Sequence, residues 1–456
     1  HLVTLEPFLF PVYGIPLVHQ AFYGSGILLY DLLGARRNGG FARHLRPASV
    51  LEYAPQLRPR GLTGGIVYHD GVEDDARLAL AVLRTALPMG GVAATRVRAE
   101  ASLLEHGWIA GATVRDLETD ASFDIHADRV IDATGVWAAR PEERFAGEES
   151  RSRIVPSRGS HVVIRRERLD ARGGLTLRIP GRVVFVIPWP GHWIIGTTDH
   201  PDSRPPAELA APGEDVDELL DTVNRTMAVD LTRDDIVGTY AGLRPLVAGP
   251  GTTDPATTVK QSREHQVTTE SNGLVRIGGG KYTTYRVMAA DVVNAALGRD
   301  EARKRPSATA NLPLVGAAPR DELDRLADEL QREATLEPAV ARSLVARHGT
   351  DSRDVVAAGR PSGGLTPLGP GIEQLEVEVA WAAKRELARS IDDVLSRRMR
   401  LSQVLPDRGA SIAPRVAELL GAELGWDAPR QQREVSSFVE RARFEYGVPQ
   451  ADGTRR

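Results

Sequence analysis

The spacing of apolar residues predicts an alternation of helix and strand in the first third of the chain. Over residues 74–85 the apolar side chains recur on one face at the helical period, which predicts an amphipathic helix that ends before Gly90-Gly91. Residues 130–133 form a short apolar run that ends in Thr134-Gly135 and predicts a strand. Between this helix and this strand lie three β-like runs, at 92–98, 108–117 and 122–127. The predicted order is therefore a helix, a β-meander and a returning strand.

The middle of the chain is rich in strand patterns, and its end is helical. The runs 160–164, 183–188 and 193–197 predict an antiparallel sheet within 153–200, and residues 215–227 predict a helix. Strand patterns return between 236 and 284. Beyond about residue 315 helical spacing dominates, at 319–334, 337–348, 373–388, 391–404, 412–424 and 428–445. We therefore predict two domains, 1–315 and 316–456.

Composition excludes several classes of function. With 456 residues, of which 42% are hydrophobic and 26% charged, the chain can bury a large globular core. A net charge of −4 indicates no nucleic-acid partner, and the lack of cysteine excludes disulfides and thiolate catalysis. No run of about 18 apolar residues predicts a membrane-spanning helix. The apolar and aromatic segment 2–30 has two interpretations, core or membrane-surface patch, and we favour core.

Metal and hydrolase chemistry find no support in the sequence. Asp74-Asp75 could suggest a metal site, but carboxylates at this position are typical of a helix N-terminus, where they cap and oppose the helix dipole. No His, Asp and Glu cluster has metal-ligand spacing, so we expect no metal. No G-x-S-x-G sequence indicates an α/β-hydrolase.

The most informative stretch is a glycine-rich turn at 278–291. Residues 274–277 predict a strand that runs into Gly278, Gly279 and Gly280, and Lys281 precedes a helical pattern. Glycines at a strand-to-helix turn allow backbone to approach a ligand closely. The start of a helix directs N–H groups and partial positive charge at that ligand, and Lys281 adds a full charge. The turn is therefore suited to a flat, anionic ligand.

Several motifs together resemble the FAD-dependent glycerol-3-phosphate dehydrogenases. They are GGKYTTYR (279–286), AGLRPL (241–246), QSREH (261–265), FVIPW (185–189) and GTTD (196–199). The resemblance extends over about 1–300 and, more loosely, over the helical end. It implies an α/β plus α fold: an FAD-dependent oxidoreductase of the two-dinucleotide-binding-domain type, like glutathione reductase and D-amino-acid oxidase. An antiparallel substrate-domain sheet and a C-terminal helical domain belong to it.

The resemblance also implies substrate and catalytic residues. Arg244 matches a substrate-binding arginine near the flavin, Arg263 matches a second phosphate-binding arginine, and Lys281 matches a lysine beside flavin and substrate. A guanidinium suits this role because its planar fork bonds phosphate oxygens in pairs. Each cation could instead be an ordinary surface residue, but the motif context favours function. His161 is a candidate base for the C2 hydroxyl, and a structural histidine is the alternative.

The implied cofactor contacts lie in three places. Val97 would contact the adenine through its backbone, unless it is an ordinary buried valine. Ala133, Thr134, Gly135 and Trp137 would lie along the adenosine or pyrophosphate. Gly279 and Gly280 would allow close approach to the flavin, and the backbone of Lys281, Tyr282 and Thr283 would face its N1–C2=O edge and stabilise negative charge there. Thr198 and Asp199 either shape the sheet near the substrate or form a structural turn.

The implied reaction is oxidation of sn-glycerol 3-phosphate to dihydroxyacetone phosphate, with hydride passing to FAD and electrons to quinone. Family members are cytoplasmic and bind the inner face of the membrane peripherally; we leave the oligomeric state open, a homodimer included. One alternative is an oxidase that uses oxygen, or a related FAD-dependent amine or amino-acid oxidase. The other is a non-catalytic remnant.

One expected element is not found. A domain of this type should open with a strand, G-x-G-x-x-G and a helix. Gly24-Ser25-Gly26 is followed by Ile, Leu and Leu and lacks the third glycine. We therefore expect the chain to lack its first pyrophosphate-binding βαβ unit and to bind FAD poorly.

Overall fold

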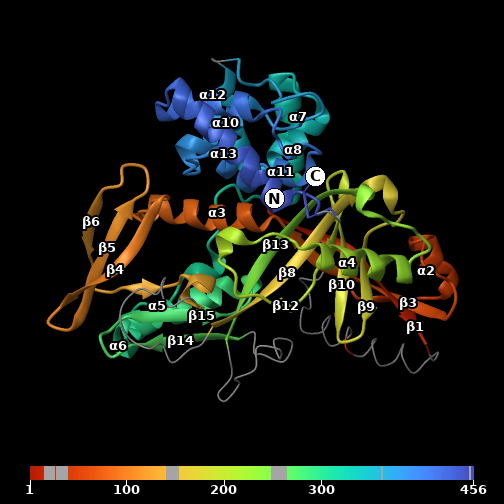
Figure 1. Cartoon of the computed structure of the whole chain (residues 1–456), viewed down its shortest axis with the longest axis horizontal. Helices are drawn as coiled ribbons and strands as arrows, with labels where there is room; N and C mark the ends of the chain where they lie inside the picture. The colour runs from red at the N-terminus through yellow and green to blue at the C-terminus, as the bar shows by residue number, and fades with distance from the viewer. Residues whose placement is uncertain are drawn as a thin grey trace.

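The computed structural model describes residues 1–14, 26, 40–139, 154–247, 264–360, 363–450 and 453–455. The C-terminal helices gather at one end of the molecule, above the sheets (Figure 1). Most of the apolar segment 2–30 lies outside the described residues. Its described part forms a strand in which Phe8, Leu9 and Val12 are buried. That part confirms the prediction of core.

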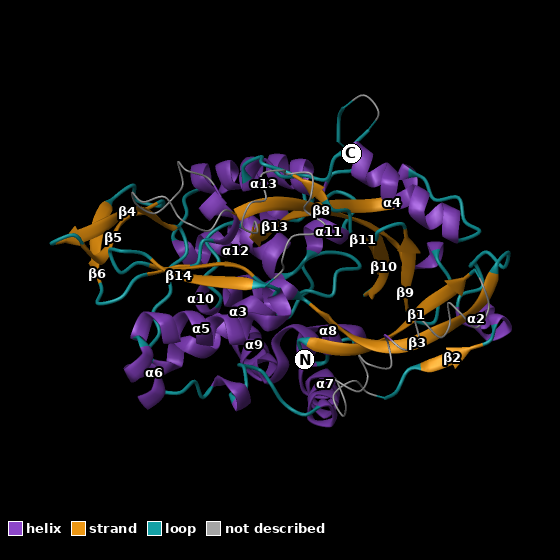
Figure 2. Ribbon diagram, turned by 90° about the horizontal axis from the view of Figure 1, so that it is seen from below, coloured by secondary structure: helices purple, strands orange, loops and turns teal. Residues whose placement is uncertain are grey.

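A nine-stranded sheet forms the centre of the fold. Its strands are β1 (Val3–Tyr13), β2 (Arg43–Leu45), β3 (Leu62–Glu73), β8 (Ile154–Arg165), β9 (Gly174–Ile179), β10 (Arg182–Trp189), β11 (His192–Gly196), β12 (His200–Pro201) and β13 (Ile236–Val247). β13 pairs with one edge of β8, and β11 and β12 share the other edge. From β11 the sheet continues through β10, β9, β1 and β3 to β2. Figure 2 shows it curving from β13 and β8 round to β1 and β3. The predicted antiparallel sheet is confirmed.

Two three-stranded sheets lie beside it. The meander is β4 (Val97–Glu105), β5 (Trp108–Asp116) and β6 (Ser122–His126), and the other sheet is β7 (Ile131–Asp132), β14 (His265–Thr269) and β15 (Val275–Gly279). β7 and β15 are parallel. The strand expected at 92–98 is wrong, because β4 begins only at Val97. Arg96 has a φ of 63°, so the chain turns there before the strand starts.

Helices of the first part connect these sheets. They are α2 (Pro47–Tyr53), α3 (Asp75–Ala86), α4 (Gly213–Thr226), α5 (Tyr285–Leu297) and α6 (Arg299–Lys304). Asp74 caps α3, and its side chain accepts a hydrogen bond from the backbone N–H of Arg77 at 3.1 Å. The carboxylate at this helix N-terminus is therefore confirmed.

The end of the chain is helical, as predicted. Its helices are α7 (Arg320–Ala334), α8 (Pro338–His348), α9 (Ser352–Gly359), α10 (Glu376–Arg385), a π-helix (Asp393–Arg398), α11 (Leu401–Val404), α12 (Ala413–Leu424) and α13 (Ala428–Tyr446). The single helix expected at 391–404 is wrong, since Arg400 has a φ of 60° and separates the π-helix from α11. α9 was not predicted.

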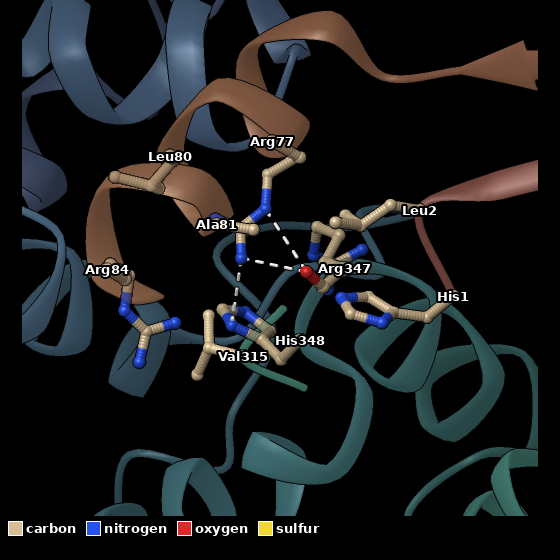
Figure 3. A pocket seen from close by; sticks show the side chains of 9 residues that line it. All are labelled: His1, Leu2, Arg77, Leu80, Ala81, Arg84, Val315, Arg347 and His348. Carbon is tan, nitrogen blue, oxygen red and sulfur yellow. Dashed lines mark hydrogen bonds between the residues drawn. The ribbon is translucent and has the colours of Figure 1, made fainter. Parts of the chain in front are cut away.

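Buried charges join α3 to the helical part. Arg77 donates two hydrogen bonds of 2.9 Å to Glu386, and Arg347 makes a bidentate pair of 2.8 Å contacts with Glu378. Figure 3 shows Arg77 also bonded to the Arg347 carbonyl and to His348, at the edge of a small pocket between α3 and α8. Because these cations have carboxylate partners, the pocket belongs to a structural interface.

The hydrogen bonds fix the protonation state of His348. Arginine can only donate, so Nδ1 of His348 must accept from Arg77 at 3.2 Å, and Nε2–H then donates to Glu378 at 2.9 Å. Burial lowers the pKa of His348, and the charge of Arg77 lowers it further. Burial alone would raise the pKa of Glu378, but Arg347 and His348 hold it well below its ordinary value. The network is therefore stable with neutral His348 and ionised Glu378.

We expect the free energy of unfolding to fall as pH drops from about 7.5 to about 5. Below the ordinary histidine pKa of about 6.5, an unfolded chain takes up a proton that folded His348 resists. Still lower pH removes the stability contributed by the depressed pKa of Glu378. Chemical denaturation at several pH values measures this slope. His348→Gln keeps an acceptor and a donor without titrating, so it should reduce the slope between these pH values; an unchanged slope would contradict the assignment.

Candidate active site

One face of β8 and β13 carries a row of sequence-predicted residues. In the antiparallel register Tyr240 lies opposite His161, Gly242 opposite Gly159, and Arg244 opposite Ser157. Directly paired residues point to the same face, so all six side-chain positions share it. Gly242 is exposed, and a Cβ added there would meet no atom within 4 Å. The two glycines thus form a floor of backbone between Arg244 and the His161–Tyr240 pair, open over Gly242 and covered by Arg244 over Gly159.

Arg244 lies at one end of this floor. Its Nη2 donates to Thr197 Oγ1 at 3.0 Å, and Nη1 lies 3.5 Å from a carboxylate oxygen of Asp199. The side chain is 28% exposed, so it is partly accessible to solvent. Arg244 therefore offers positive charge to an anion that enters the floor.

His161 lies at the other end. Its ring stacks on Tyr240 with centroids 4.6 Å apart and planes 10° apart, and it lies directly over Gly196. Burial, together with a smaller effect of the nearby charge of Arg244, lowers the pKa of His161 to about 4. Its Nδ1 is buried without a hydrogen-bond partner among the described residues. The imidazole is therefore neutral at pH 7, with a nitrogen that the surrounding described chain does not satisfy.

The helical domain closes the floor beyond Tyr240. Val163, Ile194 and Val237 form an apolar cluster against which Tyr240 and Val404 of α11 pack. A Cβ at Gly238 would lie 2.3 Å from the carbonyl oxygen of Gln403, so α11 sits directly on β13. The helical part thus forms one wall beside the floor.

The glycine-rich turn forms the start of α5. Gly279 and Gly280 have φ values of 72° and 91°, which favour glycine. A Cβ at Gly279 would lie 2.7 Å from Val247 and 2.8 Å from the Glu264 carbonyl, so the turn packs tightly on β13 and β14. Residues 281–284 are exposed and lead through a 3₁₀ turn into α5. No carboxylate of the described residues forms an ion pair with Lys281.

The turn contacts the strand that carries Arg244 and the start of α3. Val247 contacts the turn three residues after Arg244 on the same strand. Tyr282 donates a hydrogen bond to the carbonyl of Asp75 at the start of α3. The elements that carry Arg244, His161 and Lys281 are therefore neighbours. Arg263 and Gly24-Ser25 lie outside the described residues.

A second turn lies beside the first. β7 and β15 are parallel, so the turn after β7 and the turn after β15 lie at the carboxyl ends of neighbouring strands, where open α/β sheets bind ligands. Ala133, Thr134 and Trp137 are exposed there. Gly135 has a φ of 63°, and a Cβ at this position would meet no atom within 4 Å. Exposed residues on two adjoining turns, with open space at Gly135, fit an extended, flat cofactor.

Val97 is the first residue of β4 in the meander. It pairs with Asp116, at the opposite end of the meander from Trp108 and Ile109. That latter end contacts the β14–β15 turn, where the Ile109 N–H donates to the Asn272 carbonyl at 2.9 Å. The predicted contact of the Val97 backbone with the adenine stays a prediction.

The sequence analysis missed three parts of the site. Tyr240, Gly159 and Gly242 become visible only when β8 and β13 are aligned in register. Alternation along AGLRPL could have placed Gly242 and Arg244 on one face. It could not have shown which residues of β8 lie opposite, because register depends on the pairing of distant segments.

Comparison with known proteins identifies the family. Residues 20–286 match the family "FAD dependent oxidoreductase", and residues 307–431 match "C-terminal domain of alpha-glycerophosphate oxidase". Glycerol-3-phosphate dehydrogenase 2 of Mycobacterium tuberculosis is 41% identical over 447 residues, which cover 98% of this chain and 75% of the relative. The mitochondrial glycerol-3-phosphate dehydrogenase of Homo sapiens is 31% identical over 463 residues, covering 98% of this chain and 62% of the relative.

A solved structure agrees in fold. The glycerol-3-phosphate dehydrogenase of Bacillus halodurans, complexed with FAD, superposes with a TM-score of 0.80 at 24% identity and covers 98% of this chain and 82% of that one. The predicted fold class, an FAD-dependent oxidoreductase fold with a C-terminal helical domain, is confirmed. With two family matches and a 41% identical relative, the chain belongs to the FAD-dependent glycerol-3-phosphate dehydrogenases.

Proposed function

We propose that this chain oxidises sn-glycerol 3-phosphate to dihydroxyacetone phosphate with FAD as its cofactor. One observation carries the proposal: a backbone floor, open over Gly242, lies between a partly exposed arginine and a neutral histidine. Arg244 at one end suits the phosphate dianion, because guanidinium groups form paired hydrogen bonds with phosphate oxygens. His161 at the other end suits the hydroxyl that must lose its proton. The substrate named for the relatives carries both groups.

In this proposal the chain's residues perform three tasks. Arg244 and Lys281 hold the phosphate, with Arg263 as a further candidate outside the described residues. Neutral His161 accepts the proton of the C2 hydroxyl as the C2–H bond breaks, so that C2 and its oxygen form a carbonyl. When bound, FAD supplies the acceptor for the hydride. The backbone at Lys281, Tyr282 and Thr283 would support its flavin, and Ala133, Thr134, Gly135 and Trp137 its adenosine side.

Further features of the proposal concern the acceptor and the location. We propose quinone as the electron acceptor, reached at the inner face of the cell membrane, and a division of the chain near residue 315. The dehydrogenase names of the relatives support an acceptor other than oxygen. Within the described ranges, the helices are too short or too polar to cross a bilayer. We propose peripheral contact through surface residues, and a homodimer as one assembly that could present them.

Anaerobic flavin reduction tests the function. Purified protein incubated with FAD should lose nearly all of its flavin absorbance at about 450 nm when glycerol 3-phosphate is added, because hydride transfer reduces the ring. Glycerol, which lacks the phosphate, should leave the spectrum unchanged. Reoxidation by a soluble quinone analogue, without peroxide, separates the dehydrogenase from an oxidase. Protein that binds FAD and is not reduced by glycerol 3-phosphate would support the non-catalytic alternative.

A further inference from the structure

A one-residue bulge interrupts the edge of the sheet beside the floor. Gly196 at the end of β11 pairs with His161, and His200 in β12 pairs with Arg158 on the same edge of β8. β8 advances three residues between these pairs, from 158 to 161, while the partner chain advances four, from 196 to 200. The extra residue lies within Thr197, Thr198 and Asp199, and such bulges redirect side chains away from the regular ladder.

The bulge is anchored on the face of the sheet that packs on α4. Thr198 Oγ1 donates to Asp215 at 2.9 Å and accepts from the Ser160 N–H at 2.9 Å. Arg158 forms two hydrogen bonds with the same carboxylate, at 3.0 and 2.9 Å. Thr198, Ser160, Arg158 and Asp215 are all buried. Because each of these buried polar groups has a hydrogen-bond partner, the network holds the bulge in one position.

On the opposite face the bulge contacts Arg244. Thr197 Oγ1 donates to the Thr198 carbonyl at 3.1 Å, so it accepts from Arg244 Nη2 at 3.0 Å. The Thr198 carbonyl accepts from Nη1 and Nη2 at 3.4 and 3.3 Å, and Asp199 is held by the hydroxyl of Ser157. Several of these contacts are longer than the roughly 2.7–2.9 Å of strong charge-assisted bonds. They orient the guanidinium while a phosphate can still form shorter bonds with it.

Gly159 makes these contacts possible. It lies on β8 between Arg244 on β13 and the bulge on the other edge. A Cβ at this position would lie 2.4 Å from Arg244 Nη2 and 2.5 Å from Thr197 Oγ1. The guanidinium therefore crosses β8 through the space that a side chain would fill. Since both affected atoms are ends of side chains, a substitution there displaces Arg244 and leaves the strand backbone in place.

We propose that Gly159 and Thr197 are positioning residues that set where Arg244 presents its charge to the phosphate of the substrate. This inference rests on the proposed function, in which Arg244 binds that phosphate. The bulge supplies the acceptors, the buried Asp215 cluster fixes the bulge, and Gly159 leaves the passage open. Substrate affinity thus depends on two residues that need not touch the substrate.

Two variants of the FAD-loaded full chain test the proposal. Gly159→Ala should raise KM for glycerol 3-phosphate about ten- to a hundredfold, and should weaken binding of inorganic phosphate by a similar factor, because hydrogen bonds to a charged group are misplaced. The kcat should change by less than about threefold, since His161 keeps its place. Thr197→Val, which removes one acceptor, should raise KM about three- to tenfold, and Thr197→Ser should restore it.

The matched control is Gly71→Ala. Gly71 lies in β3 of the same sheet, where a Cβ would lie 3.3 Å from a Val3 side chain, and the variant should keep wild-type KM and phosphate affinity. If Gly159→Ala does not fold, the comparison of Thr197→Val with Thr197→Ser tests the proposal by itself. Wild-type KM and phosphate affinity in Gly159→Ala or Thr197→Val, while Arg244→Lys loses both, would overturn the positioning role alone. Wild-type KM and phosphate affinity in all of these variants, Arg244→Lys included, would instead overturn the proposed function.

Discussion

Replacing Glu386 with Gln should lower the free energy of unfolding by about 3–5 kcal/mol, because the change leaves a buried cation without its counter-charge. Arg77 and Glu386 are 5% and 1% exposed and share two hydrogen bonds. Arg84 lies 3.9 Å from the same carboxylate and would also lose part of its compensating negative charge. Chemical denaturation followed by tryptophan fluorescence measures the loss. Trp381 is a local reporter, since the guanidinium of Arg84 lies 5.7 Å from the centre of its ring.

An exposed ion pair provides the control. Arg415 and Glu418 are 47% and 59% exposed, so Glu418→Gln should change the free energy of unfolding by less than about 1 kcal/mol. The double change Arg77→Met with Glu386→Leu removes both charges and should recover much of the loss, as apolar replacements of buried pairs do. Equal effects of Glu386→Gln and Glu418→Gln would show that the α3 network contributes nothing specific to stability.

Replacing Arg244 with Met should lower kcat/KM for glycerol 3-phosphate by about 10²- to 10⁴-fold, since each hydrogen bond between charged groups contributes about 1.5–3 kcal/mol. Methionine keeps apolar bulk and removes both the charge and the fork. Arg244→Lys keeps the charge alone, and its loss should be smaller, because an ammonium cannot form the paired bonds. Steady-state kinetics with a dye acceptor measure both variants.

The comparison for Arg244 is an arginine on a helix outside the site. Arg353 pairs with Glu329, and both are more than a third exposed. Arg353→Met should leave kcat/KM within about twofold of wild type, as expected for a surface position. If Arg244→Met also retained wild-type kcat/KM while its flavin was still reduced, the phosphate would have to bind elsewhere.

Local patterns predicted most of the elements in this fold. The cap at Asp74 and the glycines before Lys281 follow from short-range chemistry, and the structure has both a helix start and positive φ values there. The break at Arg400 was not predictable, because local propensity favours a continuous helix. In the fold, Arg400 instead turns towards α3 and contacts Asp74 at 2.8 Å. A contact 326 residues away along the chain outweighs the local preference.

The candidate site was predictable only in part for a similar reason. Motif context drew attention to Arg244, His161 and Lys281 one at a time. The floor between them depends on which residues of β8 face Gly242, and the bulge depends on two strands sharing one edge of β8. Neither follows from spacing within one segment, since both are relations between distant ones.

The seating of α11 on β13 limits how freely the two halves of this chain can be exchanged. The apolar side chains beneath Tyr240 belong partly to the sheet and partly to the carboxyl-terminal bundle. Replacing that bundle with the one from a distant homologue would thus change the wall beside the floor, even if no residue that contacts the flavin were altered. Chimaeras of such dehydrogenases should therefore be joined so that β13 and α11 come from the same parent.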